Sequence, residues 1–480
     1  MSGRPDLVTG AVGPPADVED PDLRPSELVG EPVGRCEQLG PSQPAGRARP
    51  LQPATGGRRR HRRYDTGVVA PFLPDDEKVA AIRVALPALD AGIYLNTGSV
   101  GPLPAETAAA MAEIVDYELR IGRSSTDYWE GFLERLAEAR GAVAAVVGAE
   151  VDEIAITHST SGGMNAAVWS RDVQPTDRIV TTQAEHPGGL GPVHAAAARS
   201  GCELIVVDVG LGGDDDAIVA AFDAAIRPGT RLVALSHVLW TSGARMPIER
   251  IAALAHDRGA VIAVDGAQAA GAIPVNVADL GVDFYAIPGQ KWLLGPEGTG
   301  ALWAAAGITG SSRVSTASWF TYERIDNDAA VPWPNARRFE EAGHYRPAVT
   351  GLARSCGWLS MYVGLPWIHE RGQSMARAAV DRLAAIDGVD ILTPPDRMAT
   401  LVTFRIGGWD AEAALDEIAG RTFAIARTIP ALDAIRLSVG FFTTADEIER
   451  VATAVELLAS HTPATLPQRP RLTIIGQGAS

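Results

Sequence analysis

Cysteine is scarce in this 480-residue chain, which contains only Cys36, Cys202 and Cys356. Three thiols so far apart exclude a disulfide framework or a cysteine-rich metal cluster, and they are typical of a protein from a reducing compartment. No apolar run approaches the roughly 20 residues that a membrane-spanning helix requires. We therefore expect a soluble, cytoplasmic protein that has no membrane partner and binds no metal.

Basic residues are outnumbered by acidic ones. The 42 lysines and arginines stand against 58 aspartates and glutamates, which gives a formal net charge of −16 and argues against general nucleic-acid binding. A basic cluster at 58–63 is the exception. It has three possible interpretations, which are a nucleic-acid-binding patch, an export signal and a solvated charge cluster. Because no continuous apolar run follows it, we exclude the export signal and favour the solvated cluster.

The first 74 residues are rich in glycine, proline and arginine and show no sustained periodicity. Such a segment buries too little apolar surface to offset the entropy of ordering it, so we expect a disordered arm. A misassigned translation start is the alternative explanation for this stretch. The proline-rich residues 463–480 are expected to form a loose tail.

A carboxylate and a lysine follow two apolar runs in the middle of the chain. The run 261–264 has the pattern of a buried strand and ends in Asp265, and the run 282–287 leads to Gln290 and Lys291. Most lone lysines are exposed, but this one stands between an apolar strand and the sequence WLLGP. A lysine that forms a Schiff base and an acid that keeps a pyridine nitrogen protonated are what a pyridoxal phosphate (PLP) site requires.

A turn of small residues links a predicted strand to a predicted helix. The strand covers 153–157, the turn contains Thr160, Ser161 and Gly162, and the helix covers 164–170. A helix N-terminus presents unpaired N–H groups and partial positive charge, and hydroxyl groups add donors, so this arrangement can hold a phosphate. Taken alone, the turn is better explained by an ordinary serine or threonine N-cap.

Two histidines also follow predicted strands. His186 comes after the strand 178–182, and His237 comes after the strand 231–235. Either can be structural, and for His237 facing a cofactor and bonding a backbone carbonyl are both open. Strands alternate with helices from residue 154 to residue 303, which favours a parallel sheet with helices on both faces. Such sheets bind ligands at the carboxyl edge, where these histidines are expected.

The chain resembles a known family. The segments VDGAQAAG and VDFYAIPGQKWLLGPEGTG, at 264–271 and 282–300, are similar to the class V aminotransferase family of fold-type I PLP-dependent enzymes. The similarity extends from about residue 94 to residue 451 and looks closest to the cysteine/cystine C-S lyases and the isopenicillin N epimerase-like enzymes. It implies the α/β fold of fold-type I enzymes, with a mainly parallel sheet flanked by helices, a smaller α+β C-terminal domain, and a homodimer.

The resemblance and the composition together divide the chain into five parts. These are an arm at 1–74, a segment lining the active site at 75–110, a large PLP-binding domain at 111–345, a small C-terminal domain at 346–462 and a tail at 463–480. The strands expected in the small domain are 389–392, 399–406 and 435–438.

The resemblance also implies roles for individual residues. Lys291 would carry PLP and then remove the α-proton of the substrate, while Asp265 would pair with the pyridine nitrogen. His186 would stack over the ring and lie near the reacting carbon. Arg436 would hold the carboxylate of an amino-acid substrate. The further cofactor-binding residues implied are Thr160, Ser161, Gly162, Gln268, Gln290 and His237, and the further substrate-binding residues are Arg427 and Asn96.

The positions of the cysteines bear on the reaction. Desulfurases that form a persulfide need a cysteine on a loop before the final strands, but no cysteine follows Cys356. Cys356 lies in a helical pattern and Cys202 opens a strand, so neither has the setting of an activated thiol. We therefore expect a C-S lyase that converts cysteine, cystine or an S-substituted cysteine to pyruvate, ammonia and a sulfur product. An epimerase, an aminotransferase and, in another class, a non-catalytic PLP-binding regulator are the alternatives.

Overall fold

The computed structural model describes residues 74–469. The predictions for the basic cluster, for Cys36 and for the rest of the arm before Pro74 lie outside the described residues, as does the tail from residue 470 onward. Among the helices between residues 74 and 469 we find no candidate for a membrane-spanning segment.

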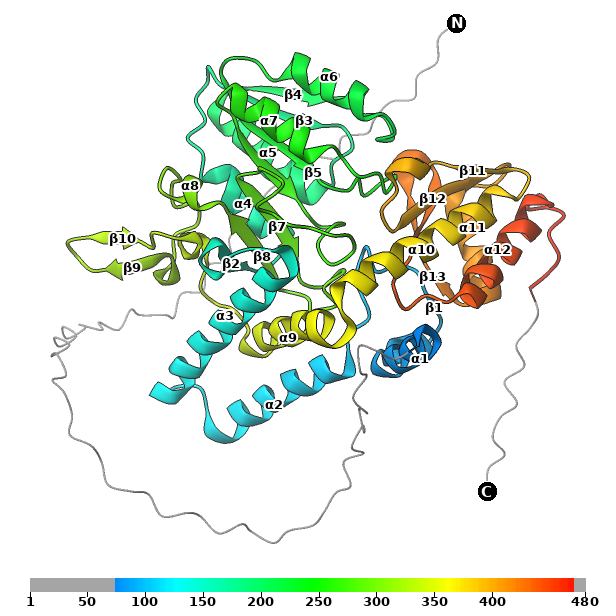
Figure 1. Ribbon diagram of the computed structural model, residues 1–480, viewed down its shortest axis with the longest axis horizontal. Coiled ribbons are helices and arrows are strands. Elements are labelled where there is room, and N and C mark those ends of the chain that lie inside the picture. Colours follow the sequence, from blue (N-terminus) through cyan, green and yellow to red (C-terminus); the bar gives the residue numbers. More distant parts are fainter. Residues whose placement is uncertain (1–73, 470–480) are drawn as a thin grey trace, which may run out of the picture. The chain divides into compact units, whose positions relative to one another are not determined.

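A seven-stranded sheet, here called the large sheet, forms the centre of the fold (Figure 1). Its strand order is β2-β8-β7-β6-β5-β3-β4, and β8 is antiparallel to both of its neighbours while the other pairs are parallel. The strands are β2 (Ile154–Thr157), β3 (Arg178–Thr182), β4 (Glu203–Val207), β5 (Thr230–Ser236), β6 (Val261–Asp265), β7 (Phe284–Pro288) and β8 (Gly300–Ala304).

Helices cover both faces of the large sheet, which explains why its central strands are apolar without alternation. In β6, Ala263 packs with α4 (Thr160–Trp169) and α5 (Pro187–Ser200), whereas its neighbours Ile262 and Val264 pack on the opposite face. The helices of that opposite face are α3 (Thr126–Val147), α6 (Asp215–Ala225), α7 (Ile248–Asp257) and α9 (Arg346–Gly357). Helix α2 (Ala105–Ile121) packs on α9.

A second, antiparallel sheet, here called the small sheet, lies in the C-terminal part of the chain. Its order is β11-β12-β15-β14, and three helices pack with it. The strands are β11 (Val389–Ile391), β12 (Leu401–Ile406), β14 (Arg427–Ile429) and β15 (Ala434–Ser438), and the helices are α10 (Leu365–Ala384), α11 (Ala411–Thr422) and α12 (Ala445–Ala459). The small sheet contacts a loop of the large sheet, because the hydroxyl of Thr403 on β12 donates to the carbonyl of Thr241 after β5, at 2.7 Å.

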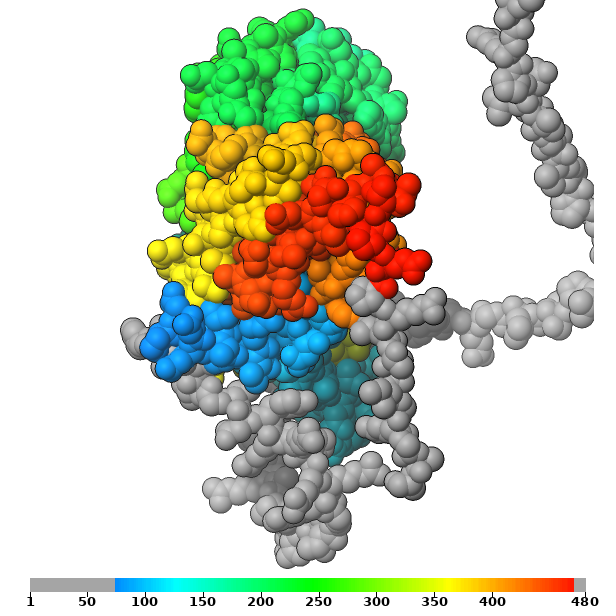
Figure 2. Space-filling model, turned by 90° about the vertical axis from the view of Figure 1, so that its right-hand side faces the viewer, coloured from blue at the N-terminus to red at the C-terminus, as the bar shows by residue number. Residues whose placement is uncertain are grey.

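The N-terminal segment connects the small sheet with the large-sheet core, in which its residues Ile82, Leu86 and Leu89 are buried. Strand β1 (Ile93–Tyr94) pairs in parallel with β13 (Ala424–Ile425), and Ile93 and Leu95 join the small-sheet core. Helix α1 (Asp75–Ala85) is held by an ion pair of 2.8 Å between Arg83 and Glu447 of α12. Figure 2 shows this segment in blue directly against the C-terminal elements in orange and red.

Most of the strands predicted from the sequence are present. β3 has the predicted bounds, and β6 ends at Asp265 as expected. Helix α4 begins four residues earlier than predicted, at Thr160, because the Ser159 hydroxyl accepts the Gly162 N–H at 3.1 Å and starts the helix there. The hairpin of β9 (Tyr322–Ile325) and β10 (Ala330–Pro332) was not predicted, since these short, largely exposed strands carry no apolar alternation.

A buried ion pair connects α3 to the chain after β10. Arg140 donates from Nε and Nη2 to the two carboxylate oxygens of Glu340, each at 2.7 Å, and the Ile156 N–H donates to the same carboxylate at 3.0 Å. Both side chains are buried. Arg140 is therefore the main compensating charge of the carboxylate, and Arg337 lies farther away, at 4.0 Å.

Replacing Arg140→Met should destabilise the protein by about 3–5 kcal/mol, because it removes both short hydrogen bonds to the buried Glu340 carboxylate and leaves only the more distant Arg337 as a cation. Urea unfolding followed by circular dichroism measures the change. Arg135→Met, which removes an exposed α3 ion pair with Glu138, is the matched control and should cost no more than about 1 kcal/mol. Equal unfolding midpoints for the two variants would contradict a stabilising role for the buried pair.

Candidate active site

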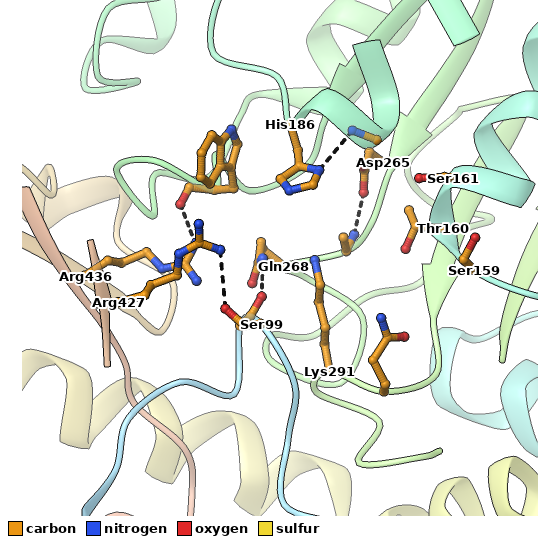
Figure 3. Close-up of a pocket in the computed structure, with 15 residues that line it drawn as sticks. Ser99, Ser159, Thr160, Ser161, His186, Asp265, Gln268, Lys291, Arg427 and Arg436 are labelled. Carbon is orange, nitrogen blue, oxygen red and sulfur yellow. Dashed lines mark hydrogen bonds between the residues drawn. The ribbon is translucent and has the colours of Figure 1, made fainter. Parts of the chain in front are cut away.

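A pocket of about 260 Å³ lies at the carboxyl edge of the large sheet (Figure 3). Residues of the N-terminal segment, of the helix starts α4 and α5, of the loops after β5, β6 and β7, and of β14 and β15 line it. Nine of the twelve predicted site residues are among them, namely Thr160, Ser161, His186, Asp265, Gln268, Gln290, Lys291, Arg427 and Arg436.

A carboxyl group and an amine from adjacent strands share this pocket. Asp265 ends β6, is buried, and accepts the Ala267 N–H at 2.8 Å through Oδ1. Burial raises the pKa of Asp265, while the charge of Lys291 acts in the opposite direction. Burial lowers the pKa of Lys291 to about 8, against the opposing effect of Asp265. Lys291 thus holds a proton less firmly than an ordinary lysine.

Close backbone packing positions Lys291. The Gly101 N–H donates to the Gln290 carbonyl at 2.7 Å, and a Cβ at Gly101 would lie 2.4 Å from the Lys291 carbonyl oxygen. Only glycine permits this approach. On the other side, Leu294 adopts a φ of 52° and donates its N–H to the Lys291 carbonyl. The lysine backbone is therefore held between the N-terminal segment and its own turn.

Two helix N-termini face the pocket, those of α4 and α5. Ser159, Thr160 and Ser161 of α4 line it, and a Cβ at Gly188 of α5 would lie 2.5 Å from the Ser161 Oγ. The Oε1 atom of Gln290 is buried there without a hydrogen-bond partner. Unpaired helical N–H groups and hydroxyls make this end of the pocket suited to an anion.

His186 is the N-cap residue of α5. Its Nδ1 accepts the Gly188 N–H at 3.0 Å, so the proton of the neutral ring is on Nε2. Its ring contacts Trp240 edge-on, with centroids 5.1 Å apart. Burial, followed by the charges of Lys291 and two arginines, lowers the pKa of His186 to about 4. The imidazole is consequently neutral at physiological pH.

Two arginines line the side of the pocket formed by the small sheet. Arg427 on β14 stands opposite Arg436 on β15, which is fully buried. Arg436 donates from Nη1 to the Trp240 carbonyl at 2.7 Å, and its Nε and Nη2 have no partner. Burial, and secondarily the neighbouring Arg427, lowers the pKa of Arg436 to about 9. Arg427 approaches the Ser99 hydroxyl at 3.4 Å.

Gln268 connects the two sides of the pocket. Its Nε2 donates to the Gly98 carbonyl at 2.8 Å, and its Oε1 accepts from the Trp292 indole at 3.0 Å. A Cβ at Gly98 would lie 2.8 Å from the Gln268 Oε1 and from the Ser438 Oγ. The amide is thus oriented by the protein itself, with one N–H left for a ligand.

Three predicted residues lie outside the pocket lining. The Gly162 N–H is used by the Ser159 cap, and Asn96 accepts the Ser99 hydroxyl at 2.8 Å, so both act on neighbours that do line it. His237 bonds the Tyr285 hydroxyl at 2.9 Å, and its N–H donates to the Asp265 carbonyl. The ring of His237 therefore bonds neither a backbone carbonyl nor a residue of the pocket lining, and its role as a cofactor-binding residue stays a prediction.

Six residues that line the pocket were not named as site residues from the sequence. They are Gly98, Ser99, Ser159, Gly188, Trp240 and Ala267. Ser159 and Trp240 follow predicted strands, as the identified residues do, so position at a strand end was an available signal for both. Ser99 belongs to the segment 75–110 that the resemblance implied would line the site, although it was not named individually, and its segment pairs with β13 and with Ser438 of β15.

Comparison with known proteins identifies the fold and family. Residues 93–451 match the family described as aminotransferase class-V. The chain belongs to the class V aminotransferase family. It is therefore a PLP-dependent enzyme with the fold of fold-type I members, as the sequence resemblance implied.

The members of the family that are similar to this chain are named for different activities. A probable cysteine desulfurase of Methanothermobacter thermautotrophicus is 28% identical, over 79% of this chain and 97% of the relative. The isopenicillin N epimerase of Streptomyces clavuligerus is 29% identical, over 76% and 94%. The solved structure of the cystine C-S lyase C-DES with its product cysteine persulfide has a TM-score of 0.74 and 26% identity, over 79% of this chain and all of that one.

The pocket of this class V aminotransferase fits PLP. The phosphate would lie at the N-terminus of α4, near the hydroxyls of Thr160 and Ser161, and the amide N–H groups of Gln290 could donate to it. The buried Asp265 would face the pyridine nitrogen, and the amine of Lys291 points into the same space (Figure 3).

The rate at which cofactor-free protein takes up PLP should follow the deprotonation of Lys291. Only the neutral amine attacks an aldehyde, so the rate should fall about tenfold for each pH unit below about 8 and level off above it. The visible absorption of lysine-bound PLP measures this uptake across pH. Lys291→Ala should show no such absorption, and a midpoint at the ordinary lysine pKa would contradict the effect of burial.

Proposed function

We propose that this enzyme is a C-S lyase that removes the sulfur substituent from a cysteine-type amino acid. The observation that carries this proposal is the absence of a thiol from the pocket, as far as residues 74–469 are concerned. In the net reaction, an S-substituted cysteine and water give pyruvate, ammonium and a thiol, or a persulfide when the substrate is cystine. The likeness to the cystine C-S lyase C-DES supports the same assignment.

The two described cysteines are unsuited to accept a sulfur atom. Cys356 is buried in α9, and burial raises the pKa of its thiol to about 12, so it carries almost no thiolate at neutral pH. Cys202 lies just before β4, which is an edge strand of the large sheet remote from β6 and β7. This distinguishes the chain from enzymes that pass sulfur to their own cysteine, although relatives carry the name desulfurase.

Each residue of the pocket would have a different role in the reaction. Arg436 would hold the α-carboxylate, because its free Nε and Nη2 form a planar edge that matches two carboxylate oxygens. Lys291, with its lowered pKa, would accept the α-proton as a neutral amine. PLP, when bound, withdraws electrons from the α-carbon, and Asp265 favours this by pairing with the ring nitrogen. His186, neutral and edge-on to Trp240, would shield the reacting centre from water.

Epimerisation is the second candidate, favoured by the similarity to isopenicillin N epimerase. It requires a proton to return to the opposite face of the α-carbon, and that face needs a donor. His186 is a poor one, because burial and nearby cations lower its pKa to about 4. Transamination is the remaining alternative and would leave a keto acid that retains the substrate's side chain.

Proton NMR in D2O distinguishes these reactions. PLP-loaded protein is mixed with cystine, S-substituted cysteines and plain amino acids, with Lys291→Ala protein as the control. We expect pyruvate from the sulfur-containing amino acids alone, at a rate reduced by at least about 10³-fold in the variant. Loss of the α-proton signal without pyruvate or another keto acid would overturn the lyase in favour of the epimerase.

We also propose that the protein is a cytoplasmic homodimer. Unpaired thiols at Cys202 and Cys356 agree with a reducing compartment. Large apolar side chains are exposed on packed helices around α9, including Leu119 at 82% and Met361 at 78% exposure, and such apolar surface is typical of an interface.

Sedimentation tests the dimer. The wild-type protein should sediment at twice the mass of one chain, and Leu119→Glu should shift it toward the monomer by burying a charge in the interface. Val84→Glu on α1, equally exposed at 77%, is the control and should remain dimeric. A monomeric wild-type protein at micromolar concentration would refute the proposal.

A further inference from the structure

A second acidic residue, Glu185, lies behind the pocket. It comes after β3 and directly before His186, the N-cap residue of α5. Its side chain is buried, but it is not among the residues that line the pocket, and the reaction described above gives it no role. Burial destabilises the charged form of a carboxyl group, so a carboxyl at this position lowers the stability of the fold unless its surroundings compensate for it.

Two hydroxyl groups from the ends of neighbouring strands hold the carboxyl group of Glu185. The Thr182 hydroxyl on β3 donates to Oε1 at 2.6 Å, and the Ser236 hydroxyl on β5 donates to Oε2. Within residues 74–469 no lysine or arginine donates to this carboxyl group. Hydrogen bonds from hydroxyls stabilise the charged form less than an ion pair does, so both the charged and the protonated form are accessible.

Asp265 lies next to the groups that hold Glu185. Ser236 on β5 stands opposite Asp265 on β6, and the N–H of His237 donates to the Asp265 carbonyl at 3.0 Å. On the other side, a Cβ at Gly189 of α5 would lie 3.3 Å from the Oδ2 atom of Asp265. The strand that donates to Glu185 and the helix that follows Glu185 therefore both contact Asp265. Asp265 lines the pocket (Figure 3), and Glu185 lies behind it.

Glu185 is the member of this cluster that changes its charge near neutral pH. Burial raises the pKa of Glu185 to about 7, the two hydroxyl groups act against this rise, and the charge of Asp265 adds to it. Burial lowers the pKa of His186 and of His237 to about 4, so both rings are neutral. The other titratable groups near Asp265 are Lys291, which would carry PLP in the holoenzyme, and Tyr285 on β7, whose pKa burial raises well above its ordinary value.

We propose that Glu185 is a positioning residue for the protons of bound PLP, and that it acts on the ring nitrogen through Asp265. When Glu185 gives its proton to solvent, a second negative charge stands behind Asp265, and the ring nitrogen and the amine that carries PLP hold their protons more firmly. When Glu185 is protonated, the charge of Asp265 acts alone. Because the proposal concerns the cofactor of a PLP-dependent enzyme, it does not depend on the C-S lyase function.

Two replacements of Glu185 separate its charge from its shape. Glu185→Gln keeps the shape and loses the charge, whereas Glu185→Asp keeps the charge and is one methylene shorter. The visible absorption of lysine-bound PLP, followed from acid to alkaline pH without substrate, gives the midpoint at which the bound cofactor loses its proton. Glu185→Gln should move this midpoint to lower pH by about one unit, the size expected for one partly screened charge in a protein interior. Glu185→Asp should keep a midpoint near that of the wild type.

Glu203→Gln, which changes an exposed carboxylate on β4, is the matched control and should keep the wild-type midpoint. Cofactor content and circular dichroism establish that each variant is folded and loaded. A midpoint that is unchanged or raised in Glu185→Gln would overturn the proposal. A midpoint that moves in Glu185→Asp as much as in Glu185→Gln, or in Glu185→Asp alone, would mean that only the shape of the side chain matters, which also overturns it.

A second measurement observes the proton of Glu185 itself. Infrared absorption of protonated carboxyl groups in the holoenzyme should fall as the pH rises through the neutral range, and this change should be absent from Glu185→Gln. Ser236→Ala removes a donor to the charged form and should move the change to higher pH. A change that persists in Glu185→Gln, or none in the wild type, would overturn the proposal. Neither measurement involves pyruvate, so a failure of the C-S lyase function is observed separately.

Discussion

The mutual placement of one buried acid and one buried amine in the pocket determines the chemistry of this protein. Asp265 and Lys291 each lose hydration on burial, and the attraction between them offsets only part of that loss. The result is a carboxyl with a raised pKa beside an amine with a lowered one. Neither value would arise on the protein surface, and both depend on β6 and β7 being covered by helices on both faces.

The rest of the pocket is organised by positive potential. Helix N-termini supply it at one end, where hydroxyls and the Gln290 amide are grouped, and the Arg427–Arg436 strand pair supplies it at the other. A molecule with anionic groups at both ends is therefore complementary to the whole length of the pocket. The neutral His186 contacts Trp240 edge-on, and these two rings contribute shape rather than charge.

Local sequence signals were sufficient for the large sheet and for the residues that end its strands. Buried parallel strands are continuous apolar runs, so the amino-acid pattern alone assigns Asp265 and Lys291 to strand ends. Contacts between distant segments were not predictable in this way. The Gln268–Gly98 bond joins residues 170 positions apart, and the placement of His237 against Tyr285 depends on side chains from two strands.

The division of the pocket between two sheets has a consequence for how this enzyme can diversify. Arg427 and Arg436 belong to the small sheet, whereas Asp265 and Lys291 belong to the large-sheet part. The groups suited to the substrate and those suited to the cofactor are thus carried by separate structural modules. Exchange of side chains in the first module can alter which amino acid is accepted while the catalytic apparatus of the second is inherited intact.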